Sequence, residues 1–475
     1  MARLFGTDGV RGIANVELTC EMAYRLGQAA AIYLGKTIVV GRDTRRSGDM
    51  LGAALSAGIM SAGGTVLEAG IIPTPGVALL VREMRAAGGA VISASHNPPE
   101  YNGIKFFDAQ GFKLPDAVED EIEAFIVNGG LEGEVAAAEE AAWSAAQAAA
   151  PDAPADATSY LASEIKMPAG AEVGVVIPLE NACDIYIDHA ARSIEDQGIS
   201  FKGLRIALDT GHGASSLTSP EALRRLGAEV IVINDDFDGM DINVQCGSTH
   251  LEPLRALMAE TGADVGIAHD GDADRVMLMA PDGTEIDGDM VEAVCALDMR
   301  ERGVLAGDTV VSTVMCNFGF VRAMKEMGIN VVQTKVGDRY VLEAMREHGY
   351  SIGGEQSGHM ILLDHNSTGD GLMTACQFLA AVIRSGKPVA EAIQVMEKMP
   401  QTLINVRVND KHAVEGSAEV AAAVAAAEEA LGEDGRVLLR PSGTEPVVRV
   451  MVEAVDPAAA QAHAEAIAAV VEACV

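Results

Sequence analysis

Several patterns that would assign a sequence to a common functional class are missing here. The 7 cysteines contain no Cys-x-x-Cys pair, so neither a zinc site nor a disulfide framework is indicated. No apolar run is long enough to span a bilayer, and the first residues, MARLFGTDGVRG, hold no apolar segment of a signal peptide. Scattered thiols are typical of a reducing compartment, so we expect a cytoplasmic protein with no membrane partner.

Basic residues are also scarce. There are 34 Lys and Arg against 69 Asp and Glu, which gives a formal net charge of −35. So acidic a surface argues against nucleic acid and anionic membranes as partners. It also repels phosphorylated ligands at long range, so a phosphate site would need local clusters of Arg and Lys.

The common nucleotide-binding motifs are absent as well. The sequence contains no G-x-x-x-x-G-K-[ST] loop and no G-x-G-x-x-G motif after a predicted strand. Neither ATP nor NAD is therefore indicated as a cofactor.

A recurring strand–turn–helix rhythm is present along the 475 residues. Strands are expected at 37–41, 204–209 and 308–314, each followed by a helix, which predicts parallel sheets with helices on both faces. Residues 401–409 instead alternate apolar and polar, which indicates an antiparallel strand. The predicted fold class is α/β, with three related α/β domains of mixed or parallel sheets and a smaller C-terminal α+β domain.

The expected domains are residues 1–150, 181–299, 300–398 and 401–475. Residues 131–180 do not fit the rhythm, because they are rich in Ala, Glu and Pro and carry the only tryptophan, Trp143. We interpret this stretch as an insertion or linker with a structural role. It could equally contribute to a subunit contact, and the sequence leaves a homodimer open.

The stretch 91–108, VISASHNPPEYNGIKFFD, holds a serine where a buried strand ends. Two prolines favour a stiff loop, and a glycine lets the chain turn before Lys105. Ser95, His96 and Lys105 thus lie on one predicted loop at the end of a strand, where α/β domains bind ligands. A serine there can act as a nucleophile or carry a phosphate, whereas Ser-Ala-Ser alone would be an ordinary polar turn.

A second loop, HDGDADR at 269–275, follows the apolar residues ADVGIA. Asp270, Asp272 and Asp274 alternate along it, so three carboxylates can converge, and such hard oxygen ligands favour Mg²⁺ or Ca²⁺. A calcium-binding EF-hand is excluded by Arg275 and Pro281, which stand where Gly and Glu are required. We therefore expect Mg²⁺ completed by a phosphate oxygen, with Arg275 able to pair with that phosphate.

Three further segments carry groups suited to anions or sugars. In FGTDGVRG at 5–12, a glycine-rich turn ends in Arg11 and suits a phosphate or carboxylate. In SIGGEQSGHM at 351–360, a mixed set of donors and acceptors can read sugar hydroxyls or an amine. In RPSGTEPVVR at 440–449, hydroxyls, amides and arginines suit a phosphate clamp, although a hairpin turn would also explain the glycine. The residues concerned are Arg11; Glu355, Gln356, Ser357 and His359; and Arg440, Ser442, Gly443, Thr444 and Arg449.

Two weaker candidates for phosphate contact, Lys335 and Arg339, lie in KVGDRY. Together, these loops indicate phosphoryl transfer on a small-molecule phosphosugar. Because no nucleotide site is indicated, the phosphate would be stored on the protein, and Ser95 is the best carrier.

Six motifs make the chain resemble the α-D-phosphohexomutase family. They occur in the family's order and span nearly the whole chain: FGTDGVRG at 5–12, ISASHNPPEYNGIKFF at 92–107, DGDADR at 270–275, KVGDRYVLE at 335–343, GGEQSGH at 353–359 and RPSGTEPVVRVMVE at 440–453. One departure is Ala273, where many relatives carry glycine.

The resemblance implies four domains around a central active-site cleft. Ser95 would be the phosphoserine, and its phosphate would share Mg²⁺ with Asp270, Asp272 and Asp274. Glu355 and Ser357 would bind sugar hydroxyls. The residues expected at the distal phosphate are Arg440, Ser442, Gly443 and Thr444.

The family reaction passes through a 1,6-bisphosphate that reorients and returns its other phosphate to the serine. Lys105, His96 and His359 are candidates for general acid or base work. Gln356 favours an aminosugar, because relatives that act on glucose or mannose phosphates tend to carry methionine there. The implied reaction interconverts glucosamine 6-phosphate and glucosamine 1-phosphate for UDP-N-acetylglucosamine and cell-wall precursors. A phosphoglucomutase/phosphomannomutase is the alternative, and a phosphatase or a sugar-phosphate sensor is more distant.

Overall fold

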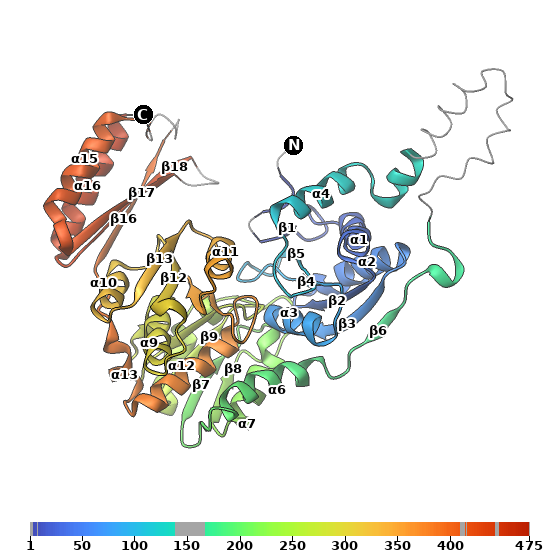
Figure 1. Cartoon of the computed structure of the whole chain (residues 1–475), viewed down its shortest axis with the longest axis horizontal. Helices are drawn as coiled ribbons and strands as arrows, with labels where there is room; N and C mark the ends of the chain where they lie inside the picture. Colours follow the sequence, from blue (N-terminus) through green and yellow to red (C-terminus); the bar gives the residue numbers. More distant parts are fainter. Residues whose placement is uncertain are drawn as a thin grey trace. The chain divides into compact units, whose positions relative to one another are not determined.

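The structure, a computed structural model, describes residues 3–6, 8–137, 167–408, 414, 416–441 and 446–474 (Figure 1). The chain forms two compact units. The first comprises Met1–Val314 and Val332–Ile393, and the second comprises Met315–Val331 and Gln394–Val475.

The first sheet of the first unit is mixed, with strand order β1-β5-β4-β2-β3-β6. β4, β2, β3 and β6 run parallel, whereas β5 is antiparallel to β4 and β1 is antiparallel to β5. Helix α3 packs on β2 and β4, and α1 packs on α2 and α4. The elements are β1 (Val10–Ile13), α1 (Cys20–Ala29), η1 (Ala30–Leu34), β2 (Thr37–Arg42), α2 (Ser47–Ser61), β3 (Thr65–Ile71), α3 (Thr74–Glu83), β4 (Gly88–Ile92), β5 (Tyr101–Phe107), α4 (Asp116–Val127), η3 (Gly170–Glu172) and β6 (Val176–Pro178).

The second sheet has the order β11-β10-β9-β7-β8. β9, β7 and β8 are parallel, and β10 returns antiparallel to β9. The elements are α6 (Ala182–Glu195), β7 (Arg205–Asp209), η4 (Ala214–Leu217), α7 (Ser219–Arg225), β8 (Glu229–Ile233), η5 (Gly247–Thr249), α8 (Glu252–Thr261), β9 (Val265–His269), β10 (Val276–Met279) and β11 (Glu285–Ile286).

The third sheet has the order β13-β12-β14-β15, with β12 and β14 parallel and β15 antiparallel to β14. Helix α12 packs on α9, and α11 packs on β12 and β14. The elements are α9 (Gly288–Glu301), η6 (Ala306–Asp308), β12 (Thr309–Thr313), β13 (Asn330–Thr334), α11 (Asp338–His348), β14 (Ile352–Gly354), β15 (Met360–Leu362), α12 (Gly371–Ser385) and α13 (Val389–Ala392).

The second unit contains an antiparallel sheet of order β16-β18-β17, on which α15 and α16 pack. Alternating residues of β18 face these helices and form the unit's core with alanine-rich helix faces, where Val450 and Ala464 are fully buried. The elements are α10 (Phe318–Glu326), η7 (Ile393–Val395), β16 (Gln401–Arg407), α15 (Ala418–Leu431), η8 (Gly432–Asp434), β17 (Gly435–Pro441), β18 (Val447–Ala454) and α16 (Pro457–Ala473).

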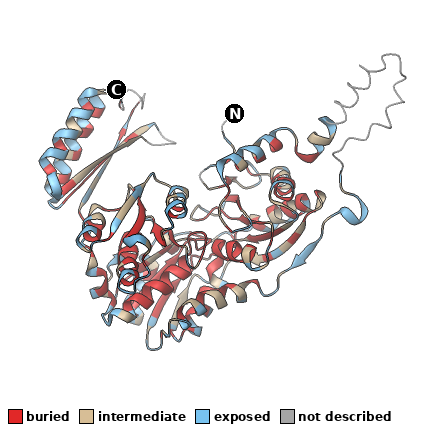
Figure 2. Cartoon of the chain, in the orientation of Figure 1, coloured by how far each residue is buried: buried red, intermediate tan, exposed pale blue. Residues whose placement is uncertain are grey.

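The three larger sheets share one local feature. In each, a buried parallel strand ends in a loop, and the next strand returns antiparallel beside it: β4 to β5, β9 to β10, and β14 to β15. These strands are almost wholly buried, as Figure 2 shows by the red colour of the sheets. The predicted α/β class with a smaller C-terminal α+β domain is therefore confirmed.

Two expectations about the first sheet are wrong. Lys105 does not lie on the serine loop but on strand β5, because residues 101–107 pair in register with β4 and Lys105 lies opposite Val91. Gly103 is likewise a strand residue, opposite Arg11. Val176–Pro178 forms the edge strand β6, whereas no strand is predicted there from the sequence.

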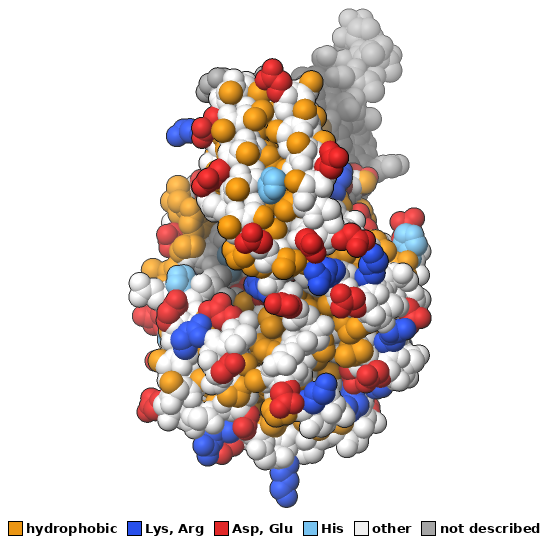
Figure 3. Space-filling view, turned by 90° about the vertical axis from the view of Figure 1, so that its left-hand side faces the viewer, with side chains coloured by type: hydrophobic (Ala, Val, Ile, Leu, Met, Phe, Trp, Pro, Cys, Tyr) orange, Lys and Arg blue, Asp and Glu red, His pale blue; other side chains and the backbone are white. Residues whose placement is uncertain are grey.

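The remainder of the Ala-rich stretch is described only in part. Residues 130–137 are helical, while residues 138–166, with Trp143, lie outside the described residues. None of the described helices is long and apolar enough to cross a membrane. On the face shown in Figure 3, acidic and basic side chains are interspersed.

Candidate active site

Ser95 lies just beyond β4 and is 1% exposed. Its hydroxyl donates a hydrogen bond of 2.6 Å to Asp270 Oδ2 and lies 3.3 Å from His96 Nδ1. Its backbone has φ +52°, a left-handed conformation that a side chain adopts only at a cost in energy. The predicted serine and one predicted metal ligand, 175 positions apart, are thus in direct contact.

The serine loop is held by a buried arginine from the end of β2. Arg45 donates to the carbonyl oxygens of Ser95 (2.9 Å) and Asn97 (2.7 Å), and its Nε donates to Asp43 Oδ2 (3.0 Å). Asp43 in turn accepts 2.7 Å from Ser93 Oγ, and Ser93 Oγ accepts from the Ser95 amide. No role was predicted for Arg45 or Asp43, although two opposite charges directly after a buried strand are a signal that could have found them.

The metal-loop aspartates converge as predicted. The carboxylates of Asp270, Asp272 and Asp274 each offer an oxygen, all within 4.8 Å of one another, and all three residues are buried. The loop lies against the serine loop, since a Cβ on Gly271 would be only 2.8 Å from Ser95 O. Ala273 has φ +53°, a conformation that glycine adopts at lower cost.

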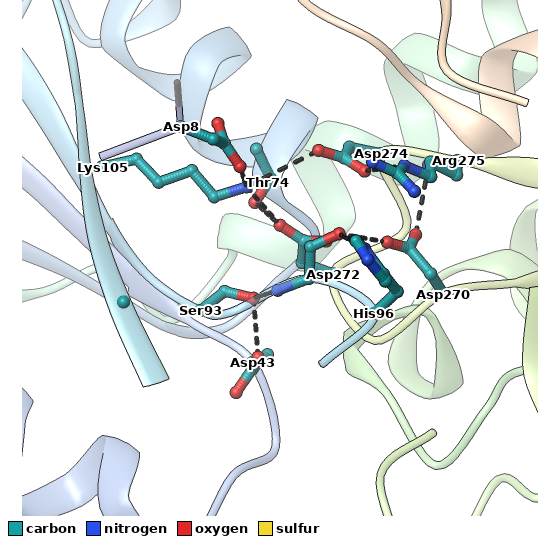
Figure 4. Close-up of polar contacts among 12 residues, drawn as sticks. Asp8, Asp43, Thr74, Ser93, His96, Lys105, Asp270, Asp272, Asp274 and Arg275 are labelled. Carbon is teal, nitrogen blue, oxygen red and sulfur yellow. Dashed lines mark hydrogen bonds and ion pairs between the residues drawn. The ribbon is translucent and has the colours of Figure 1, made fainter. Parts of the chain in front are cut away.

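Lys105 reaches the same carboxylates from β5, as Figure 4 shows. Its Nζ lies 2.8 Å from Asp272 Oδ2, 3.2 Å from Asp8 Oδ2 and 3.5 Å from Asp274 Oδ2. Thr74 Oγ1 also donates a hydrogen bond of 2.6 Å to Asp272 Oδ2. Lys105 is buried, and its carboxylate partners outweigh the effect of burial and raise its pKa, so it remains a cation.

Burial and neighbouring charges shift the pKa values of Asp270 and Asp274 in opposite directions. Burial, with repulsion from Asp274 and Asp272, raises the pKa of Asp270 well above its usual range. Burial acts on Asp274 too, but the Lys105 ammonium, helped by His359, outweighs it and holds the pKa of Asp274 well below its usual range. Burial and the neighbouring Arg275 and Arg11 lower the pKa of His96 to about 4, so its imidazole is neutral at pH 7.

The donor set fits a hard divalent cation. Asp272 Oδ1 and Asp274 Oδ1 are buried and accept no hydrogen bond from the described residues. Buried polar atoms are normally paired, because an unpaired one costs about 1–3 kcal/mol. A group of three carboxylates with orphaned oxygens could therefore hold a metal ion, and oxygen ligands favour Mg²⁺ or Ca²⁺.

The predicted sugar loop joins β14 to β15 and lies against the metal loop, since the Val276 amide donates to Gly358 O (3.1 Å). Ser357 is exposed, while Glu355 and Gln356 are half-buried. Glu355 Oε1 accepts from the Gly337 amide (3.1 Å), and Gln356 Nε2 donates to Asp289 Oδ2 (3.0 Å).

His359, at the end of this loop, faces two carboxylates. Its Nδ1 is 3.7 Å from Asp274 Oδ2, and its Nε2 is 3.4 Å from Asp338 Oδ2. Burial lowers the pKa of His359, but the two carboxylates outweigh it and leave the pKa raised. The ring thus contacts the metal loop directly.

Three predicted arginines of the first unit are engaged with carboxylates or backbone. Arg11 pairs with Asp8, and the Arg275 amide donates to Asp270 Oδ1 (3.1 Å), while its Nε lies 3.9 Å from Asp274 Oδ1. Arg339 donates to Leu114 O (2.6 Å).

Lys335 is exposed, with its Nζ 6.0 Å from the centre of the Tyr340 ring. Lys113, which was not singled out in the sequence, pairs with both Asp8 and Asp338.

The predicted phosphate clamp belongs to the second unit and is described only at its edges. Arg440 on β17 lies opposite Arg449 on β18 in the antiparallel register. Burial, with repulsion from Arg449, lowers the pKa of Arg440. Ser442, Gly443 and Thr444 lie outside the described residues.

Family models match almost the whole chain in order. They are phosphoglucomutase/phosphomannomutase alpha/beta/alpha domain I at residues 2–131, domain II at 184–283, domain III at 287–399, and the C-terminal domain at 403–470. The chain belongs to this phosphoglucomutase/phosphomannomutase family, as its motifs predicted.

Two individual relatives, matched over nearly their whole length, are both phosphoglucosamine mutases. The phosphoglucosamine mutase of Carboxydothermus hydrogenoformans is 48% identical over 478 residues, covering 99% of this chain and 100% of that protein. The phosphoglucosamine mutase of Streptomyces coelicolor is 49% identical over 465 residues, covering 96% of each.

Solved structures show the same fold. A phosphoglucomutase/phosphomannomutase family protein from Burkholderia thailandensis matches with a TM-score of 0.79 and 24% identity, over 99% of this chain and 97% of that one. The N-acetylphosphoglucosamine mutase of Aspergillus fumigatus, solved with GlcNAc-6P and magnesium, matches with a TM-score of 0.67 and 17% identity, over 99% and 96%.

Proposed function

We propose that this protein interconverts glucosamine 6-phosphate and glucosamine 1-phosphate, with Ser95 as the phosphate carrier. The observation that carries the proposal is the hydrogen bond of 2.6 Å between Ser95 Oγ and Asp270, inside a group of three buried aspartates. Full-length likeness to phosphoglucosamine mutases supports the aminosugar as substrate. The same likeness favours this function over the alternative, a phosphoglucomutase or phosphomannomutase.

The transfer balances without a nucleotide. The bond between phosphorus and Ser95 Oγ breaks as a bond to one sugar hydroxyl oxygen forms, and the hydroxyl proton passes to a base. The resulting 1,6-bisphosphate turns round, a bond forms between Ser95 Oγ and its other phosphorus as the bond from that phosphorus to the sugar oxygen breaks, and the serine proton passes to the sugar oxygen. The sugar leaves with its phosphate on the other position.

Asp270, Asp272 and Asp274, with an oxygen of the serine phosphate, would hold Mg²⁺. Bound there, the ion supplies neutralising charge for the transferring phosphoryl group. The orphaned oxygens of Asp272 and Asp274 support this assignment, and the Aspergillus relative was solved with magnesium.

The proton and charge roles fall to different side chains. His96 lies beside Ser95 Oγ and is placed to exchange a proton there. Lys105 remains charged among its carboxylates and suits stabilisation of negative charge on the phosphoryl group. His359 stands behind Asp274 and suits orientation of that carboxylate.

The other predicted residues complete the assignment. Glu355 and Ser357 bind sugar hydroxyls, and Gln356 reads the substituent at C2. Arg11 and Arg275 face the transferring phosphate, which explains two arginines beside buried carboxylates in so acidic a chain. Phosphate-binding groups are also expected in the second unit: Arg440, Ser442, Gly443, Thr444 and Arg449.

We expect four functional domains at residues 1–150, 181–299, 300–398 and 401–475, and a cytoplasmic enzyme, because aminosugar nucleotide precursors of the cell wall are made there. A homodimer is the oligomer we would test for first.

A substrate comparison tests the proposal. Phosphorylated protein with Mg²⁺ receives glucosamine 6-phosphate, glucose 6-phosphate or mannose 6-phosphate, and the 1-phosphates and free phosphate are quantified. We expect at least a tenfold higher kcat/KM for the aminosugar. Equal or better turnover of glucose or mannose phosphate would identify the alternative, and free phosphate as the main product would identify a phosphatase.

A further inference from the structure

The Gln356 side chain is held by a buried carboxylate on a different element. Its Nε2 donates 3.0 Å to Oδ2 of Asp289, in the first turn of α9. Asp289 is fully buried, whereas Gln356 is half-buried. The contact thus joins a partly accessible amide to an inaccessible acid.

The backbone on both sides of this contact is also fixed. The Gly288 amide donates to Gln356 O (3.0 Å), and Asp287 Oδ1 caps α9 by accepting from the Met290 amide (3.2 Å). A Cβ on Gly288 would lie only 2.0 Å from Glu355 O, so helix and loop touch main chain to main chain. Asp289 therefore meets Gln356 in one defined geometry.

This geometry determines which end of the amide is presented. A carboxylate only accepts hydrogen bonds, so the amide group of Gln356 that faces Asp289 must be its NH₂. The carbonyl Oε1 is then the end turned away from Asp289, and the only side-chain hydrogen bond of Gln356 to the described residues is the one from its Nε2. An outward acceptor suits a ligand group that only donates, as an ammonium does.

Two further acids lie near this contact. Glu292, one turn along α9, is fully buried, and burial together with the charge of Asp289 raises its pKa well above the usual range. Glu355, on the loop itself, is a half-buried carboxyl.

We infer that Asp289 is a specificity-determining positioning residue: it orients Gln356 so that the amide oxygen accepts from the 2-ammonium group of an aminosugar phosphate. The inference rests on the proposed function. Asp289 itself does not touch the sugar and acts only through Gln356.

The test is a double-mutant cycle with Asp289→Asn and Gln356→Met, measured with glucosamine 6-phosphate and glucose 6-phosphate. The asparagine side chain that Asp289→Asn introduces can donate as well as accept, so the Gln356 amide is free to rotate and exchange the positions of its oxygen and nitrogen. We expect Asp289→Asn to lower kcat/KM for the aminosugar about tenfold, mainly through KM, and that for glucose 6-phosphate less than threefold. On the Gln356→Met background, Asp289→Asn should change the aminosugar preference less than twofold, because the side chain it orients is gone.

Glu292→Gln is the matched control, since it is an equally buried acid on the same helix without a bond to Gln356, and it should keep the preference. Thermal unfolding of each variant establishes that it is folded. A wild-type protein that does not prefer the aminosugar overturns the proposed function. A wild type that does, with the preference unchanged in Asp289→Asn or lost equally on both backgrounds, overturns the inference about Asp289 alone.

Discussion

The hydroxyl of Ser95 donates a 2.6 Å hydrogen bond to the carboxylate of Asp270. The two residues come from different sheets, and each sits on a loop between a parallel strand and its antiparallel neighbour. The contact puts a nucleophilic oxygen beside the three aspartates that could hold a metal ion.

Replacing Ser95 with alanine should abolish turnover. Among the residues that the structure describes, Ser95 supplies the hydroxyl bonded to Asp270, so we expect a loss of about 10⁴-fold or more in kcat. Far-ultraviolet circular dichroism should remain that of the wild type, because only one oxygen is removed. Ser385→Ala, which removes a hydroxyl at the end of α12, is the control. Substantial mutase activity in Ser95→Ala would rule out the phosphoserine mechanism.

Replacing Asp272 with alanine should remove metal binding and activity together. The change deletes one of three converging oxygens and leaves the Lys105 ammonium beside the vacated position. Titration calorimetry with Mg²⁺ should show affinity reduced about 100-fold or more, and a chelator should inactivate the wild type until Mg²⁺ is restored. Asp282→Ala, an exposed carboxylate on the turn after β10, should bind as the wild type does. Unchanged Mg²⁺ affinity in Asp272→Ala would place the metal elsewhere.

Replacing Arg45 with lysine should lower kcat while the charge is retained. The planar guanidinium bonds several carbonyl oxygens of the serine loop and Asp43 at once, and an ammonium cannot reach them all. We expect about a 10- to 100-fold loss in kcat with a smaller change in KM. Arg192→Lys, on the exposed face of α6, is the comparison. Equal kinetics in Arg45→Lys and the wild type would show that the serine loop keeps its shape without the guanidinium group of Arg45.

Glu119 on α4 should make stability fall with rising pH. Burial, opposed in part by Arg339 and Arg3, raises its pKa to about 7 from 4.5. Between these two values the unfolded chain releases the proton and the folded chain keeps it, so stability declines through this window and is lowest above pH 7. Glu119→Gln removes the cost, which is about 2–3 kcal/mol at most.

The Tm of Glu119→Gln should therefore exceed that of the wild type more at pH 8 than at pH 5. Glu121→Gln, exposed on the same helix, should show no such pH dependence. A constant difference between Glu119→Gln and the wild type at both pH values would mean that Glu119 is ionised in the folded protein.

Regular elements were predictable where local pattern and burial agree. The apolar run IVV of β2 and the alanine-rich helix α15 follow from sequence alone, because each satisfies its own periodicity. Strand β5 was missed because Gly103 suggested a turn. The aromatic and β-branched residues around Gly103, which favour a strand, were the better signal.

In the site, residues carrying distinctive chemistry were predictable, and residues that position them were not. Three alternating aspartates indicate a cation site from their local spacing alone. Arg45 and Asp289 act on partners 50 and 67 positions away, and such pairing depends on how sheets and helices meet. No local pattern encodes it.

The three hairpin loops have a further consequence. The residues proposed for phosphate storage, cation binding and sugar choice lie on separate loops, each between two strands that pair through their backbones. The residues of each loop can therefore change while the strands on both sides stay the same. Selection can therefore change which sugar is accepted by rewriting residues 355–359 and their support on α9, while the transfer chemistry is inherited intact.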